Sequence, residues 1–230
     1  MFRELYRQIS TADWLALAIF AAGWIGYSLY ADRTADGARG LRAATGRHRL
    51  QWARELVRRD NRITDVALTG NLMQSVSFYA STTTYVIAGL IAVAGTLDKL
   101  ILLTADLPFA KAAAKEVVEM KIFLLAGIFI FAYFKFTWSL RQFNFLSIMV
   151  GGAPDPHSDE GVRESYAQSF AQLSTLAGDE FNRGIRAYYF GFAAMTWFVS
   201  PQLFIAFTLL ILLVLWRRDF HSRTLDVLSH

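Results

Sequence analysis

Residues 129–145, FIFAYFKFTWSLRQFNF, decide the class of fold. The run is apolar and aromatic for most of its length, carries Lys135 inside it, and ends with Arg141, Gln142 and Asn144. A lysine within a membrane span is costly and is by default a sign of a functional site. The stretch therefore predicts a membrane helix with a functional polar end.

The composition supports a membrane protein. The 230 residues are 54% apolar and 15% aromatic, with a mean hydropathy of +0.32, which exceeds that of ordinary soluble domains. The absence of cysteine excludes disulfides and iron–sulfur clusters. All four histidines lie outside the apolar segments, which argues against a membrane-buried haem and most zinc sites. We therefore expect no cofactor and no metal.

The predicted fold is all-α. We expect one integral membrane domain, a polytopic transmembrane bundle of four long spans with short amphipathic helices in the connectors. The spans are predicted at about 13–30, 66–97, 120–150 and 184–216, and the connectors at 32–62, 98–119 and 151–180.

The connector 32–62 indicates the topology. It holds nine arginines and only four acidic residues, so the positive-inside rule places it in the cytoplasm and the protein in the cell inner (plasma) membrane. Apolar residues on one face predict a surface helix at His48–Arg59. Beyond a topology signal, the arginines could bind anionic lipid head groups or a partner protein. Nucleic acid is not expected.

The last apolar segment contains a proline. Pro201 lies near the middle of 184–216 and is predicted to kink one span. The alternative is that it separates two half-helices. The preceding polar stretch, Gly161–Ala177, is weakly amphipathic and is expected to form a separate helix outside the bilayer.

Polar residues of three spans are predicted to meet at a cytoplasmic polar mouth. The start of span 66–97, the end of span 120–150 and the start of span 184–216 lie on the same side in this topology. The mouth would comprise Asn71, Gln74, Lys135, Ser139, Arg141, Gln142, Asn144, Asn182, Arg183, Arg186 and Tyr189.

Lys135 is expected to be a lone cation. The stretches 66–97, 122–154 and 184–218 contain no Asp or Glu, so a carboxylate proton relay in the membrane is not expected. Lys135 could snorkel or make a structural contact, or it could line a cavity filled by water or a ligand. A mouth rich in cations suits a small anion or a lipid phosphate.

The sequence contains no recognisable catalytic constellation, so no catalytic residues are predicted and we do not expect an enzyme. The favoured function is an oligomeric membrane protein that binds or conducts a small anion or anionic lipid, like a channel or transporter. Gly23 and Gly26 offer a close-packing face for a homo-oligomer. The alternative is a structural or accessory subunit of a larger membrane complex, with no transport or catalytic activity.

Three blocks of the sequence carry a resemblance to a known family. They are NLMQSVSFYAST (Asn71–Thr82), the stretch Phe129–Gly151, and NRGIRAYYFGFAAMTWFVSP (Asn182–Pro201). Together they resemble the uncharacterised membrane proteins catalogued as domain of unknown function 599. The resemblance implies a four-helix integral membrane protein and brings no known activity. Phe143 and Phe145 stand where the family pattern has tyrosine and histidine.

Overall fold

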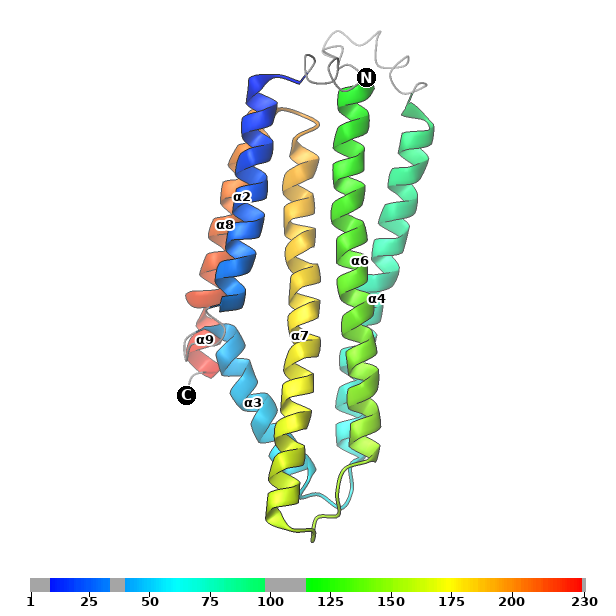
Figure 1. Ribbon diagram of the computed structural model, residues 1–230, viewed down its shortest axis with the longest axis vertical. Coiled ribbons are helices and arrows are strands. Elements are labelled where there is room, and N and C mark those ends of the chain that lie inside the picture. The colour runs from blue at the N-terminus through cyan, green and yellow to red at the C-terminus, as the bar shows by residue number, and fades with distance from the viewer. Residues whose placement is uncertain (1–8, 34–39, 98–114, 229–230) are drawn as a thin grey trace.

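The computed structural model describes residues 9–33, 40–97 and 115–228, in which every regular element is an α-helix (Figure 1). The helices are α2 (Thr11–Arg33), α3 (Leu41–Leu56), α4 (Ile63–Gly95), α6 (Lys115–Gly151), α7 (Glu160–Thr196), α8 (Pro201–Phe220) and α9 (Arg223–Leu228). Of the predicted connector 98–119, residues 98–114 lie outside the described residues, and residues 115–119 form the start of α6.

The first three predicted spans are confirmed as helices; all three begin earlier than predicted, and α4 ends at Gly95, two residues before its predicted end. The helices α2, α4 and α6 are each long and apolar enough to cross a membrane. The start of α2 is fixed by a reciprocal cap: the Ser10 amide donates to Asp13 Oδ2 at 3.2 Å, and the Asp13 amide donates to Ser10 Oγ at 3.1 Å. Helix α3 confirms the predicted surface helix and begins earlier, at Leu41.

The predicted fourth span, 184–216, is wrong. Residues 197–200 turn the chain, and α7 and α8 run in opposite directions as a helical hairpin (Figure 1). Ser200 caps α8 by accepting a hydrogen bond from the Leu203 amide at 3.2 Å, and Pro201 occupies the first turn. Proline is favoured there because its missing N–H would have no helical partner. Pro201 therefore starts a helix, and the predicted kink is wrong.

The predicted connector 151–180 is also much shorter than expected. Only 152–159 are non-helical, and Asp159 caps α7 by accepting a hydrogen bond from the Gly161 amide at 2.8 Å. The polar stretch Gly161–Ala177 is thus the first part of α7 and not a separate helix. This stretch is polar because the first part of α7 has different surroundings from the more apolar part that follows it in the same helix.

The molecule has two halves that share α4, α6 and α7. Residues Tyr79, Phe136 and Phe181 of these helices meet at ring distances of 5.4–5.7 Å and mark the boundary. We call α2, α8 and the parts 79–95, 115–136 and 181–196 the five-helix half. We call α3 and the parts 63–78, 137–151 and 160–180 the four-helix half. Figure 1 shows α2 and α8 beside the upper part of α7, and α3 beside its lower part.

Aromatic rings fill the five-helix half. Phe20 lies 4.9 Å from Phe204 and 5.7 Å from Phe190, and Trp24 stacks on Phe190 at 5.5 Å. Trp197 stacks on Phe204 at 5.3 Å. These contacts join α2, α7 and α8 into one packed core.

Helices α6 and α7 approach closely at Gly184. A Cβ added there would lie 2.4 Å from Phe136 Cε1, so only glycine leaves room for the ring. In the four-helix half, α3 covers α7 with Ala53 and Leu56, and Trp52 meets Phe170 edge to face at 5.1 Å. The two halves thus use different partners for the same helix, α7.

We predict that Phe136→Ala destabilises the protein much more than Phe134→Ala. Phe136 has no exposed surface, whereas Phe134 on the same helix is 63% exposed. Truncating a buried phenylalanine costs about 3–5 kcal/mol. Thermal unfolding in detergent should show a large fall in Tm for Phe136→Ala and a small one for Phe134→Ala. Equal effects would contradict the assigned packing.

Candidate functional site

The boundary between the two halves is crossed by ion pairs. Lys135 Nζ lies 2.9 Å from Glu180 Oε2, and Glu180 also pairs with Arg183. Arg183 Nη2 and Arg186 Nη2 each lie 2.9 Å from a carboxylate oxygen of Asp32. The prediction that Lys135 is a lone cation is therefore wrong. Glu180 lies four residues before the stretch 184–218, which contains no Asp or Glu. Because α7 continues through both, Glu180 lies at the same level as Lys135.

Helices α3 and α8 add further pairs at the same level. Arg42 of α3 donates to both carboxylate oxygens of Asp179, with Nε at 2.7 Å from Oδ1. Asp219 of α8 accepts from Arg218 Nε at 2.9 Å and from the Tyr27 hydroxyl at 2.6 Å. These hydrogen bonds and ion pairs connect the ends of α2, α3 and α8 to one another and to the middle of α7.

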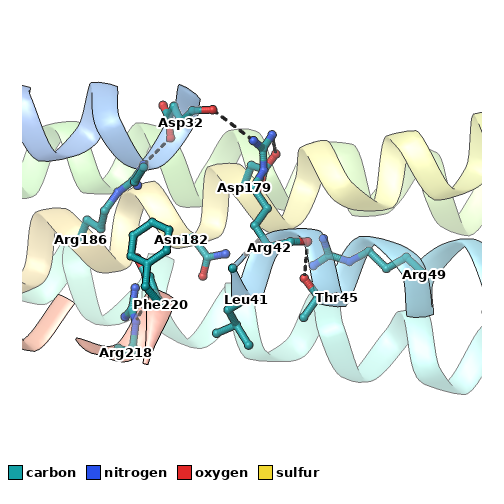
Figure 2. Close-up of a pocket in the computed structure, with 13 residues that line it drawn as sticks. Asp32, Leu41, Arg42, Thr45, Arg49, Asp179, Asn182, Arg186, Arg218 and Phe220 are labelled. Atoms are coloured by element: carbon teal, nitrogen blue, oxygen red, sulfur yellow. Dashed lines mark hydrogen bonds and ion pairs between the residues drawn. The ribbon is translucent and has the colours of Figure 1, made fainter. Parts of the chain in front are cut away.

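A cavity of about 360 Å³ opens among these four helices (Figure 2). Polar and charged residues form most of its lining, and four other residues complete it. The polar residues are Asp32, Arg42, Thr45, Arg49, Asp179, Asn182, Arg186, Arg218 and Asp219. The others are Ala31, Gly40, Leu41 and Phe220. We call this cavity the arginine pocket.

Two buried or partly buried arginines of the pocket, Arg186 and Arg49, differ in what the protein gives them. Arg186 is only 6% exposed, and its Nε has no hydrogen-bond partner within 9–33, 40–97 and 115–228. Arg49 lies against Gly178, where an added Cβ would come within 2.2 Å of its Nη2. Burial lowers the pKa of Arg49, and the negative charge of Asp179 opposes that shift. The unpaired Nε of Arg186 and the positive charge of Arg49 thus both belong to residues that line the pocket.

Cations outnumber carboxylates around the pocket. We define the junction cluster as the cations Arg42, Arg49, Lys135, Arg183, Arg186 and Arg218 with the carboxylates Asp32, Asp179, Glu180 and Asp219. Six positive groups thus face four negative ones. Arginine presents several N–H donors in a planar fork that matches phosphate or carboxylate oxygens. Among the groups that line the pocket itself, four cations face three carboxylates, and this excess of positive charge suits an anion such as phosphate.

The structure brings together only part of the predicted polar mouth. Asn182 and Arg186 line the arginine pocket. Lys135 and Arg183 lie beside it in the ion-pair network, and the Tyr189 ring lies 5.7 Å from the Arg218 guanidinium.

The other predicted mouth residues lie elsewhere. Ser139 is buried and donates to the Ala177 carbonyl at 2.7 Å, and Gln142 is buried. The remaining four residues are exposed, two on α4 and two on α6: Asn71, Gln74, Arg141 and Asn144. The helical spacing of these residues was read correctly. The direction of the helix face, however, depends on which neighbours pack against it, and spacing does not contain that information.

Sequence reasoning missed Arg42 and Arg49 as pocket residues. They stand seven positions apart on α3 and therefore share a face, and this spacing could have singled them out. Most other connector arginines are engaged within the protein. Arg54 pairs with Glu164 at 2.7 Å and Arg59 with Asp65 at 2.9 Å. The connector is thus largely a folded, ion-paired element.

Fold and junction together define the class of protein. An all-helical bundle with three helices able to cross a membrane, and with a charged layer at one end of the apolar half, is consistent with an integral membrane protein. The chain belongs to the family described as protein of unknown function, DUF599, whose model matches residues 15–224. No curated protein and no solved structure matches the chain.

We predict that Glu180→Gln lowers stability more than Lys135→Met. Losing the carboxylate leaves Lys135 and Arg183 without a shared anion, whereas losing the lysine still leaves Glu180 paired with Arg183. Removing one partner of a buried ion pair costs about 3–5 kcal/mol, and partial exposure of the cations should reduce that figure. Thermal unfolding gives the ranking. Glu164→Gln in the exposed pair with Arg54 is the control and should change Tm little.

Proposed function

We propose that the protein is a multi-pass protein of the plasma membrane, with the bilayer around the five-helix half. Helices α2 and α8 have 23 and 20 residues, which corresponds to about 35 and 30 Å. A bilayer hydrocarbon core is about 30 Å thick. Large apolar side chains are exposed around this half, among them Ile25, Phe123 and Leu213. The four-helix half, with its ion-paired surface, would lie in the cytoplasm.

The helical hairpin improves the agreement with the positive-inside rule. With α7 and α8 as separate crossings, the chain crosses five times, and the end of α8 returns to the side of α3 (Figure 1). Arg217 and Arg218 at that end then join the nine arginines of the connector on one side. This charge distribution supports a cytoplasmic position for the arginine pocket.

We predict opposite accessibility for Gln51 and Val199. Both are exposed, Gln51 on α3 and Val199 in the turn between α7 and α8. The protein contains no cysteine, so Gln51→Cys and Val199→Cys each introduce a single thiol. An impermeant maleimide added to intact cells should label the cysteine at 199, and the one at 51 only after permeabilisation. Labelling of position 51 from outside would reverse the topology.

The function we propose is binding of an anionic phosphate group, from a lipid head group or a free anion, in the arginine pocket. The observation that carries this proposal is a pair of guanidinium groups in the pocket lining, that of Arg49 and that of Arg186, whose buried Nε has no hydrogen-bond partner among the described residues. Unsatisfied buried donors are costly, and an anion with several acceptor oxygens would relieve that cost.

Several features favour a lipid as the source of the phosphate. The pocket lies at the end of the apolar half, the level at which lipid head groups would surround α2 and α8. Ala31, Leu41 and Phe220 give it an apolar wall. Above it, Phe190 stacks on Trp24 and meets Phe20 edge to face, and these rings fill the space between α2 and α7. This packing supports a recess that binds a ligand rather than a conducting path through one subunit.

We predict that Arg49→Gln weakens anion binding about ten-fold or more, since a hydrogen bond to a charged group contributes about 1.5–3 kcal/mol. Arg47→Gln is the matched control, because Arg47 is exposed on the same helix. Native mass spectrometry of the full chain in detergent, titrated separately with phosphatidylglycerol, phosphatidylcholine and inorganic phosphate, measures the effect. Selective loss of phosphatidylglycerol binding supports the lipid source, and loss of inorganic phosphate binding supports the free anion. No binding to the wild-type chain would overturn the proposal.

The second candidate is a structural or accessory subunit without transport or catalytic activity. It is favoured because carboxylates of the same chain neutralise Lys135 and Arg183, and these ion pairs join neighbouring helices. In that case the pocket ligand would be a structural lipid. In both candidates we propose no enzymatic reaction and expect the protein to work as a homo-oligomer.

A further inference from the structure

We propose that two copies of this chain pack side by side along the outer face of α4. The contact face consists of Asn71, Gln74, Phe78, Ser81, Tyr85, Ala88 and Ala92, which we call the α4 stripe. All seven residues are exposed, including Phe78 at 66% and Tyr85 at 77%. The proposal rests on the membrane placement proposed above and not on ligand binding in the arginine pocket.

The spacing of the stripe fits a helix–helix contact. Its members recur at alternating intervals of three and four residues over more than twenty positions. Such a 3.5-residue period keeps one seam facing a parallel partner helix in a left-handed pair. The small side chains Ser81, Ala88 and Ala92 would allow close approach within the bilayer.

Helix α4 is longer than a bilayer requires, and its outer face carries no charge. The part 63–78 extends beyond the level of Tyr79, where α2 ends, by about 24 Å at 1.5 Å per residue. No charged residue occurs from 66 to 97, yet Val66, Leu68 and Leu72 are exposed on this projecting part. A solvated helix normally has charged residues on its outer face. An uncharged face that exposes these apolar side chains outside the bilayer indicates a protein neighbour.

The chemistry of the stripe favours a second copy as that neighbour. The partner must follow α4 from the bilayer into the aqueous phase, which a second α4 in parallel orientation does by symmetry. The carboxamides of Asn71 and Gln74 both donate and accept hydrogen bonds, so this face complements itself. Arg141 on the outer face of α6 would instead oppose its own copy, which places the two-fold contact on α4.

Cysteine cross-linking of the full chain in native membranes tests the contact. In a parallel two-fold pair, each stripe residue lies near the same residue of the partner. Ser81→Cys and Ala88→Cys are therefore expected to form disulfide-linked dimers at twice 25.9 kDa on addition of copper phenanthroline. Ser169→Cys is the matched control, because Ser169 is exposed on α7 away from α4. It should remain monomeric under the same conditions.

Two results would overturn the proposal. One is monomer for both Ser81→Cys and Ala88→Cys when their thiols react with a membrane-permeant maleimide. The other is equal dimer formation by Ser169→Cys. Phosphatidylglycerol binding by the same variants separates this test from the proposed function. Intact binding without cross-links rejects the α4 contact alone, whereas cross-links without binding by the wild-type chain reject the pocket alone.

Discussion

The pairing of Asp32 and Glu180 with the surrounding cations holds the two halves of the molecule in register. Asp32 is the last acidic residue of α2, and both Arg183 and Arg186 of α7 reach it at 2.9 Å. Glu180 lies one helical turn before Arg183 on α7 and forms an ion pair with Lys135 of α6. Pairing stabilises charges that are partly removed from water, so these pairs fix the height of α2 and α6 against α7. The pocket exists because the ends of α2, α3 and α8 are all held at this level.

Helix length imposes a second constraint on the architecture. The 33 residues of α4 and the 37 residues each of α6 and α7 exceed the roughly 20 residues that a bilayer needs by about two thirds or more. The shorter helices α2 and α8 end where the charged layer begins. The surplus length of the three long helices is then covered on one side by α3, whose Ala53 and Leu56 pack against α7. The face of α4 has no such cover within the described part of one chain.

Hydrophobic run length predicted α2, α4 and α6 well, because about twenty apolar residues have few alternatives to a membrane helix. The same criterion failed across Pro201. There the apolar character continues through a tight turn, and only the cap of Ser200 and the proline after it show where the next helix begins. The partner of Lys135 was missed for a related reason, since Glu180 belongs to the polar connector 151–180, which was expected to lie outside the bilayer. The site was predicted only in part: Asn182 and Arg186 were identified, while Arg42 and Arg49 belong to the connector 32–62, whose arginines were interpreted as a topology signal or a patch for lipid or a partner.

The continuity of α7 has a mechanical consequence. Its lower part packs against α3 and its upper part against α2 and α8, with no break between Glu160 and Thr196. Gly178 receives Arg49 and Gly184 receives Phe136, so at both points a neighbour sits directly on the backbone of the helix. A rigid rod seated in this way cannot turn at one end without turning at the other. A displacement of Asp179 or Arg186 by an occupant of the pocket would therefore be transmitted along the rod to both ends of the molecule.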